Sequence, residues 1–538
     1  MLLHAIIFVS GGAILALELL ASRIMTPYFG VSLYIWTGIL SITLVGLAIG
    51  YWLGGRLAAM RGPGANPAPR LLQLFALMPA IASVGVVAAC VAYPHTFDAL
   101  ARANLVYGAF AACLVLLFVP LVAASAMNPL LVAIVARRRD RAHAADHGAG
   151  EVFFVSTLGS VAGVLVTSFG LIPYVSNFTA LLGVAIVLGL LSVACVIVER
   201  VPRGGAVSTL AAASCLAAAA LLWHADAHTG RQGPFAYFGT QWRVEATFRS
   251  MFGTVKVLRS VPDPESGRFL RMYFQDGLTQ NSVDSSHRST SFYTYGLEGL
   301  ARAYQPRMRS ALVLGLGAGM VPMALAKSGI RVEVVDIDPI APRVAQDYFG
   351  FDPSLVATRE ADARTFVRDC GERRSAGYDA IVIDLFHGDG TPDYLVTREF
   401  FRDLRQCLGP SGVAVFNTFA DLEQPVSYAH FLATLRSELP HLALYRPQGH
   451  GTHVNSFVVA SAQPLAAPAP VTFAHVPPRH EQVLWNMLSA PVPIVPPLFE
   501  GGRVVTDAVN PAAHDLARMQ LLYRRNVVEG APVGLLVN

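Results

Sequence analysis

Residues 311–339 read ALVLGLGAGMVPMALAKSGIRVEVVDIDP, and this stretch decides the fold of the second half of the chain. Its apolar pattern predicts a buried strand over Ala311–Leu314 and, after a glycine turn, a helix over Met320–Ser328. A second apolar strand, Arg331–Val335, follows and ends at acidic residues. This order of strand, turn, helix and strand is typical of a nucleotide-binding α/β unit.

The glycine turn and the acids after the second strand form a predicted nucleoside-binding edge. Gly315, Gly317 and Gly319 lack Cβ atoms where the backbone must turn sharply and approach a ligand. The helix behind them offers free N–H groups at its N-terminus. Asp336 closes the next strand, where its carboxylate can accept hydrogen bonds from ribose hydroxyls, and Asp338 follows it. The GxGxG spacing followed by an acid favours a ligand of the S-adenosylmethionine type over NAD.

The composition divides the chain into two parts. A length of 538 residues suggests more than one domain, and 54% hydrophobic against 14% charged residues is too apolar for an ordinary soluble protein. Residues 1–224 contain 6 acids, 11 arginines and no lysine, whereas residues 225–538 contain 30 acids and 29 basic residues. No basic arm or patch indicates nucleic acid as a partner, and the arginine excess among apolar runs indicates membrane topology.

The first part contains apolar runs of about 20 residues, the length that crosses a bilayer. The fourth run includes Pro120 and Pro129, which predict a kinked helix. Small residues that recur every fourth position predict close packing of helices in lipid; they are Gly46, Gly50 and Gly54, and Gly159 and Gly163. The runs lie near 4–22, 33–55, 71–93, 106–136, 152–174 and 178–198, with a weaker, Ala-rich seventh near 206–223.

The arginines between the runs predict that the N-terminus is cytoplasmic. Nine lie in the even-numbered connections, and only Arg23 and Arg102 lie in the odd-numbered ones. If the run near 206–223 crosses the membrane, the second part lies outside the cytoplasm; if this run stays in the interface, the second part is cytoplasmic. The chemistry of the expected ligand favours the cytoplasm. The nine are Arg56, Arg61, Arg70, Arg137, Arg138, Arg139, Arg141, Arg200 and Arg203.

The cysteines predict neither a zinc site nor a disulfide framework, because they are scattered and form no CxxC motif or Cys/His cluster. We therefore expect no metal. They are Cys90, Cys113, Cys195, Cys215, Cys370 and Cys407.

The second part changes to the period-2 pattern of strands at about Trp242. Gly253–Leu258 and Arg268–Phe274 are predicted to form a hairpin, and Ser289–Tyr304 a helix. After the nucleotide unit, strands alternate with helices, which predicts a parallel, doubly wound sheet. Ligands of such sheets bind beyond the carboxyl ends of the strands.

Polar residues follow three of these later strands, so one crevice is expected to collect them with Asp336. Asp362 can also be explained as the N-cap of the next helix, and both interpretations stay open. The strands and the residues after them are Leu355–Glu360 with Asp362, Tyr378–Ile383 with Asp384, and Val413–Phe416 with Asn417.

Four motifs resemble the spermidine synthase (polyamine aminopropyltransferase) family: YFQDGLTQNSVD, LGLGAG, VVDID and YDAIVIDLFHGDGTPDYLVTREFFRDLRQCLGPSGVAVF. This resemblance covers about Ser250 to Ala460. The first part, with FVSGGAILALELLASRI and STLGSVAGVL, looks like bacterial proteins in which spans akin to half a major-facilitator bundle are fused to such a domain. The resemblance implies a multi-pass helical bundle in the bacterial inner membrane, followed by a Rossmann-like, doubly wound α/β domain of the S-adenosylmethionine type with a small N-terminal β-hairpin subdomain.

We predict four segments: a transmembrane helical domain of six or seven spans over 1–224, a linker over 225–249, the spermidine synthase-like domain over 250–462, and a Pro-rich wrap with a C-terminal segment over 463–538. The lipid bilayer is an expected partner, and a homodimer is the assembly we consider.

The resemblance also implies roles for the strand-end acids. Asp336 would hold the ribose, and Asp362 with Ala363 the adenine, of decarboxylated S-adenosylmethionine or S-adenosylmethionine. Asp384 stands where the family's DxxD motif begins and would accept a proton from an amine nucleophile. The second Asp of that motif is His387 here, with Asp389 as a stand-in, so we count both as catalytic candidates. The predicted substrate-binding residues are Asp276, Gln280, Tyr293, Tyr295 and Asn417.

Several positions depart from the family. Its Gln in the first hairpin corresponds to Gly253, the His of its YHE motif to Thr294, and the acid of its glycine turn to Ala318. Because these positions mostly hold amino groups, binding of an adenosyl sulfonium is supported better than aminopropyl transfer to putrescine.

Three functions therefore remain open. The first is a membrane-anchored aminopropyltransferase that acts on a polyamine or another amine, and the second is a methyltransferase-like enzyme, which Ala318 would suit. The third is a non-catalytic module that senses a nucleoside or polyamine for the membrane bundle.

Overall fold

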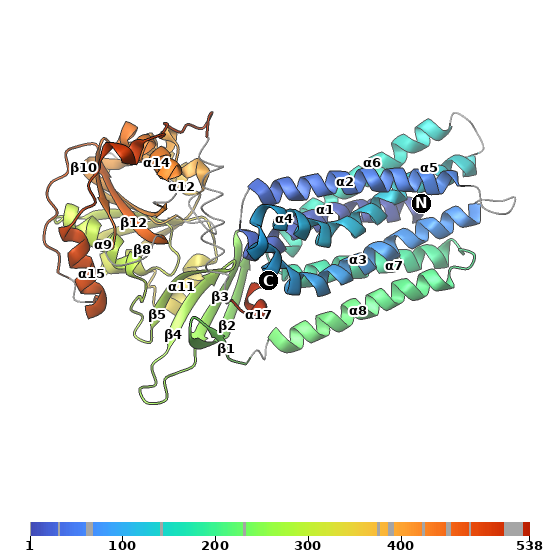
Figure 1. Cartoon of the computed structure of the whole chain (residues 1–538), viewed down its shortest axis with the longest axis horizontal. Coiled ribbons are helices and arrows are strands. Elements are labelled where there is room, and N and C mark those ends of the chain that lie inside the picture. The colour runs from blue at the N-terminus through green and yellow to red at the C-terminus, as the bar shows by residue number, and fades with distance from the viewer. Residues whose placement is uncertain are drawn as a thin grey trace. The chain divides into compact units, whose positions relative to one another are not determined.

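The computed structural model describes residues 2–30, 33–60, 68–139, 144–229, 233–373, 377–385, 392–421, 425–447, 453–472, 475–510 and 531–537. The chain forms two compact units (Figure 1). The first comprises Met1–Gly233 together with Ala531–Asn538, and the second comprises Pro234–Gly530.

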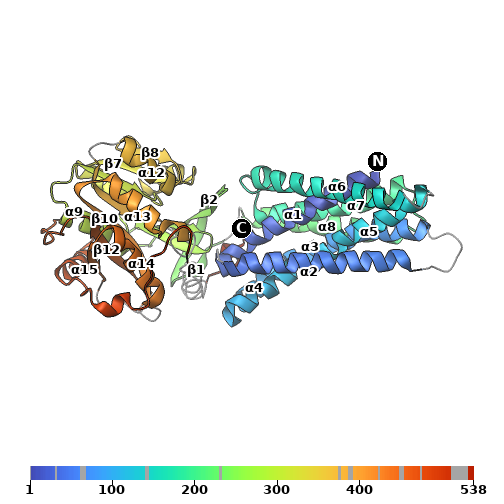
Figure 2. The same ribbon diagram turned by 90° about the horizontal axis from the view of Figure 1, so that it is seen from above.

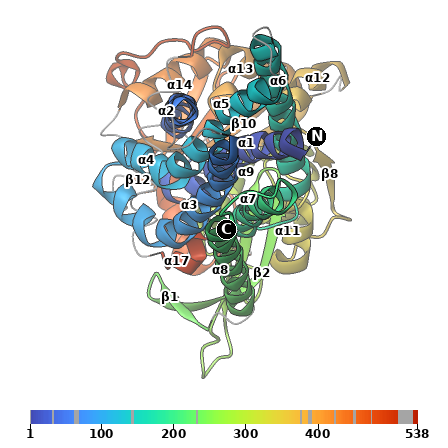
Figure 3. The same ribbon diagram turned by 90° about the vertical axis from the view of Figure 1, so that its right-hand side faces the viewer.

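The first unit is a bundle of long helices. Within the described residues, seven helices are long and apolar enough to cross a membrane, and the weak run near 206–223 is the seventh of them. Figure 3 views the bundle along its length. Its helices are α1 (Leu2–Phe29), α2 (Leu33–Ala59), α3 (Ala68–Ala103), α4 (Leu105–Cys113), α5 (Val119–Arg139), α6 (Ala144–Leu165), α7 (Asn177–Val198), α8 (Gly205–Thr229) and the short α17 (Val533–Leu536).

The small residues predicted to permit close packing do lie at helix contacts. A Cβ atom on Gly163 of α6 would collide with the backbone of Gly12 in α1, and one on Gly54 of α2 would collide with Ala126 in α5. In the fourth span, the π-helical turn Leu114–Phe118 separates α4 from α5 just before Pro120. Proline has no N–H and crowds the preceding turn, so a widened turn at this place is expected.

The second unit begins with a five-stranded antiparallel sheet in the order β1 to β5. The predicted hairpin is present as β3 and β4. The segment predicted as a linker, 225–249, contains the end of α8, the strand β1 and most of β2. The side chains of β2, with the sequence TQWRVEATFRS, alternate in burial as expected for a strand, and β2 pairs with β3. The strands are β1 (Phe235–Tyr237), β2 (Thr240–Ser250), β3 (Gly253–Ser260), β4 (Leu270–Gln275) and β5 (Leu278–Asp284).

A seven-stranded sheet follows in the order β11-β12-β10-β9-β6-β7-β8. The five strands from β10 to β8 are parallel, and β12 and β11 add an antiparallel edge. The strands are β6 (Ser310–Leu314), β7 (Arg331–Asp336), β8 (Val356–Glu360), β9 (Tyr378–Ile383), β10 (Leu408–Asp421), β11 (His441–Tyr445) and β12 (His453–Ser461).

Helices cover both faces of this sheet, which confirms the predicted doubly wound α/β fold (Figure 2). The strand β6 shows why: Ala311 and Val313 contribute to the core on one face, and Leu312 and Leu314 to the core on the other. The helices are α9 (Phe292–Tyr304), α10 (Met320–Lys327), α11 (Ala341–Phe349), α12 (Ala363–Arg373), α13 (Arg398–Cys407), α14 (Pro425–Glu438) and α15 (Pro478–Ser489).

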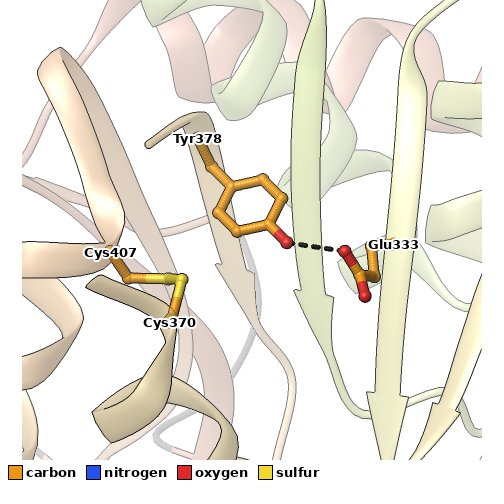
Figure 4. The surroundings of a disulfide bond; sticks show 4 residues. All are labelled: Glu333, Cys370, Tyr378 and Cys407. Atoms are coloured by element: carbon orange, nitrogen blue, oxygen red, sulfur yellow. Dashed lines mark hydrogen bonds between the residues drawn. A yellow bond between two sulfur atoms is a disulfide. The ribbon is translucent and has the colours of Figure 1, made fainter. Parts of the chain in front are cut away.

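One disulfide corrects the prediction from the cysteines. Cys370 of α12 and Cys407 of α13 form a bridge with Cα atoms 5.4 Å apart, although they are 37 residues apart in sequence (Figure 4). Beside it, the hydroxyl of Tyr378 donates a 2.7 Å hydrogen bond to Glu333. Sequence spacing could not show this pairing, because the packing of α12 against α13 creates it.

Candidate active site

The predicted site residues after the parallel strands lie along one edge of the seven-stranded sheet. The strand order places Asn417 at β10, Asp384 at β9, the glycine turn at β6, Asp336 at β7 and Asp362 after β8. Backbone hydrogen bonds connect the neighbours, including Asp384 N–H to Leu314 O (2.9 Å) and Gly315 N–H to Val335 O (2.8 Å). The ends of β9, β6, β7 and β8 therefore converge as predicted, but the predicted strand end at Phe416 is wrong, because β10 continues through Asn417 to Asp421.

Each of the three glycines of the turn is required for a different structural reason. Gly315 has a φ of 95°, and a Cβ there would collide with the carbonyl oxygen of Asp384. Gly317 has a φ of 50° and no neighbouring atom within 4 Å of an added Cβ, so its backbone borders open space. Gly319 has a φ of 76°, begins α10 and packs against Phe351. The open side at Gly317 is where a ligand can approach the backbone.

Asp336 fixes the glycine turn from the neighbouring strand. Its Oδ2 accepts a 2.7 Å hydrogen bond from the N–H of Leu316, and its Oδ1 accepts one of 2.8 Å from Asp338. Burial raises the pKa of Asp336, and these backbone donors lower it. The backbone N–H groups of Gly317 and Ile337 also act on this carboxylate, so Asp336 holds the backbone of the glycine turn and of the strand end together.

Asp338 connects the two sheets of the second unit. Its Oδ2 accepts a 3.0 Å hydrogen bond from the hydroxyl of Ser250 at the end of β2, and its Oδ1 accepts one of 3.2 Å from the N–H of Ile340. Burial raises the pKa of Asp338 to about 6. The side chain is buried, so its arrangement supports sheet docking more directly than the predicted contact with the nucleoside.

Asp362 is the N-cap of α12, as one of the two open interpretations proposed. Its Oδ1 accepts a 2.9 Å hydrogen bond from the N–H of Thr365. Its Oδ2 accepts a longer hydrogen bond of 3.4 Å from the hydroxyl of Tyr394. Ala363 after it is buried. Capping uses only one carboxylate oxygen of Asp362. Because the residue is half-exposed, its other oxygen can also contact a ligand.

Asp384 is held by a chain of two side-chain amides. The Nδ2 of Asn417 donates a 2.8 Å hydrogen bond to Oδ1 of Asp384, and the Oδ1 of Asn417 accepts one of 2.8 Å from Nδ2 of Asn455 in β12. Burial raises the pKa of Asp384 to about 6, and the Asn417 hydrogen bond opposes this rise. A carboxylate with this pKa is ionised at neutral pH and basic enough to accept a proton.

These hydrogen bonds give Asn417 a role other than the predicted one, and they add Asn455 to the candidate site. Asn417 is buried and its amide is used on both sides, so it positions Asp384. Asn455 was not predicted, because it lies on an antiparallel strand far along the chain. Only the pairing of β10 with β12 places it opposite Phe419 and beside Asn417.

Of the other predicted acceptor-side residues, Asp276 lies near Asp338, and Gln280 and Tyr293 contact each other. The Oδ1 of Asp276 accepts a 3.0 Å hydrogen bond from the N–H of Thr254, and its carboxylate fills the space where a side chain at Gly253 would stand. Asp276 also raises the pKa of Asp338 through its charge, so it lies near that edge. The Gln280 carbonyl accepts a 3.2 Å hydrogen bond from the hydroxyl of Tyr293.

Tyr295 does not present its hydroxyl to the site. It is buried, and its hydroxyl donates a 2.7 Å hydrogen bond to the carbonyl of Ser289. Its ring packs beside His475 and His480. The catalytic candidates His387 and Asp389 lie outside the described residues.

Comparison with known proteins relates the second unit to two kinds of transferase. The chain is 36% identical over 155 residues to a polyamine aminopropyltransferase of Vibrio vulnificus, which covers 28% of this chain and 50% of that protein. It is 37% identical over 138 residues to an N-terminal histidine N-methyltransferase of Emericella nidulans, over 26% of this chain and 24% of that protein. The chain thus spans half or less of the length of these two relatives.

A solved structure of a probable spermidine synthase from Corynebacterium glutamicum is 18% identical and has a TM-score of 0.36. The matched region covers 45% of this chain and 86% of the solved chain. No protein-family model matches the sequence. The aminopropyltransferase relatives agree with the motifs noted in the sequence. The chain is thus similar in part to polyamine aminopropyltransferases and to methyltransferases, and it also contains a bundle of long apolar helices.

Proposed function

We propose that the second unit is an aminopropyltransferase that uses decarboxylated S-adenosylmethionine and an amine acceptor, anchored by the apolar bundle in a bacterial inner membrane. The observation that supports this most is the carboxylate of Asp384, held by Asn417 beside the glycine turn with a pKa raised to about 6. The aminopropyltransferase relatives support the same chemistry.

The donor would lie over the glycine turn. Open space at Gly317 would admit its adenosine, and the carboxylate of Asp336, which holds the glycine turn, would accept the ribose hydroxyls. Asp362 follows β8, with β6 and β7 between it and Asp384 at the end of β9, and its second oxygen would face the adenine end. These residues would orient the donor so that its sulfonium points toward β9.

Asp384 would then act on the acceptor. Its carboxylate attracts the ammonium form of the amine and takes one proton, which frees the nitrogen lone pair. That lone pair forms the new C–N bond at the aminopropyl carbon attached to sulfur. The C–S bond breaks, its electron pair stays on sulfur, and the neutral thioether of the adenosyl group leaves. Positioning of the two reactants supplies much of the rate.

Methyl transfer is the second candidate, and Ala318 favours it. This side chain is buried in the cluster with Val255 and Val257, where the family has an acid in the glycine turn. The pocket therefore lacks one carboxylate that could hold the donor's aminopropyl ammonium. The methyltransferase relatives are consistent with this alternative.

Product analysis distinguishes the candidates. The full-length protein in native membranes is incubated with either sulfonium donor and a panel of di- and polyamines, and the products are identified by mass spectrometry. We expect an aminopropylated amine with decarboxylated S-adenosylmethionine. A methylated product would support the alternative, and binding without any product would contradict both enzymatic proposals.

A further inference from the structure

The helix α8 is packed as a full span of the bundle. The hydroxyls of Ser214 in α8 and Ser83 in α3 are 2.8 Å apart, and Ala211 and Ala218 are fully buried. Gly189 of α7 leaves room for the thiol of Cys215. No charged residue occurs from Gly205 to Trp223, so α8 lacks the polar face of a helix that lies in the membrane interface. The seventh run therefore has the length, composition and packing of a membrane span.

The arginine-rich connections meet at one end of the bundle. The side-chain amide of Gln73, at the start of α3, donates a 2.7 Å hydrogen bond to the carbonyl of Pro202, between α7 and α8. Arg70 likewise donates a 3.2 Å hydrogen bond to the carbonyl of Met60, after α2. Because α8 starts at this end and crosses once, it finishes at the opposite end.

The opposite end has few basic residues. The rings of Tyr28, Tyr93, Phe97 and Phe178 pack there, at the end of α1, along the later part of α3 and at the start of α7. The short α17 contacts α3 and lies at the same end as α4 (Figures 1 and 2). By the positive-inside rule, the arginine-rich end is cytoplasmic, and the chain leaves α8 on the other side of the membrane.

The cysteines of the two units also point to different compartments. The second unit has two cysteines, Cys370 and Cys407, and they are joined to each other. Cys90, Cys113 and Cys215 of the bundle take part in no disulfide. Disulfides persist in the periplasm and other oxidising compartments and are rare in the cytosol, where thiols are kept reduced.

From these independent observations we propose that the second unit lies on the extracytoplasmic side of the membrane, where Cys370–Cys407 is a permanent structural disulfide. This differs from the cytoplasmic side that ligand chemistry favours. The bridge closes the stretch of chain that contains β9 and Asp384. If the proposed function holds, an adenosyl donor made in the cytoplasm must cross the membrane before the transfer step.

Cysteine labelling in spheroplasts tests the side. Glu265→Cys places a thiol on the exposed turn between β3 and β4, and the matched control Gly205→Cys places one at the exposed start of α8. Each variant of the full chain is treated with a membrane-impermeant maleimide, and the unchanged chain gives the background of the native cysteines. We expect Glu265→Cys to be labelled in intact spheroplasts and Gly205→Cys only after permeabilisation. The reverse pattern would overturn the proposal.

The redox state is measured separately in the same cells. Free thiols are blocked after an acid quench, the protein is reduced, and the newly released thiols receive a mass tag. We expect two tags on the unchanged chain and none on Cys370→Ser/Cys407→Ser. Free thiols at both positions before reduction would contradict a permanent disulfide. Neither measurement involves the transfer reaction, so failure of the proposed function would leave this result standing.

Discussion

The side-chain amide of Asn417 donates a 2.8 Å hydrogen bond to the carboxylate of Asp384. Because Asn455 donates to the oxygen of the same amide, also at 2.8 Å, the nitrogen of Asn417 must face Asp384. A neutral donor that is fixed in this way stabilises the ionised acid, and it opposes the rise in pKa that burial causes. The pair thus sets both the direction and the proton affinity of the proposed base.

Replacing Asn417 should change the pH dependence of the reaction. In Asn417→Leu the donor is lost, so the pKa of Asp384 rises further and the acidic limb of the pH–rate profile moves to higher pH. We expect a shift of about one pH unit, the size typical for the loss of one such hydrogen bond. At pH values well above the new pKa, much of the activity should return.

Asn455→Ala is the matched control for this prediction. It leaves Asn417 in place but frees the amide to rotate, so the shift should have the same direction and be smaller. An unchanged profile in Asn417→Leu, with lower activity at every pH, would contradict the electrostatic role of Asn417.

The buried charge of Asp384 should lower the free energy of unfolding at neutral pH. Its pKa is raised from 3.8 to about 6 in the folded protein. The folded state therefore binds more protons than the unfolded state between these values, and stability falls as pH rises through this window. Asp384→Asn removes the effect. The variant should match the original protein below about pH 3 and exceed it by up to about 3 kcal/mol at pH 7 to 8.

Thermal unfolding across pH checks this difference. If Asp384→Asn were less stable than the original at pH 7, the buried charge would not be the dominant effect at this position.

Two similar substitutions in the glycine turn should reduce stability by different amounts. Gly315→Ala combines a φ of 95° with a collision against the carbonyl oxygen of Asp384. It should destabilise the second unit by about 3 kcal/mol or more. Gly317→Ala has a φ of 50° and open space, so it should destabilise by about 1 kcal/mol. Chemical denaturation gives both values, and equal effects would show that the contact with Asp384 is unimportant.

The bundle should depend on the contact between α1 and α6. Gly163→Val inserts a side chain against the backbone of Gly12 and should lower stability by roughly 1–3 kcal/mol. Gly183→Val in α7 is the control, because an added Cβ there has no neighbour within 4 Å. The thermal stability of the detergent-solubilised protein should fall in the first variant and stay nearly unchanged in the second. Equal loss in both would argue against tight packing of α1 on α6.

The sequence predicted the features that depend on local pattern. The spans followed from runs of apolar residues, including the weak one that became α8. The strand ends at Asp336, Asp362 and Asp384 followed from the alternation of strands and helices, since the carboxyl ends of parallel strands share one edge.

The features it could not show depend on contacts between distant segments. The partner of Asn417 lies 38 residues away at Asn455, and Cys370 meets Cys407 across two helices. Tyr295 looked available in the motif, but its hydroxyl is bonded to Ser289 by the fold of its own turn.

Transfer by the Asp384→Asn variant tests the central claim most directly. Full-length protein and variant, in the same membrane preparation, are compared for binding of the adenosyl donor and for the amount of aminopropylated amine formed per unit time. The account predicts that donor binding is retained while product formation falls by about 10²–10⁴-fold, the loss expected for a general base. Product formation at the original rate would contradict the assignment of Asp384 as the base and, with it, the proposed active site.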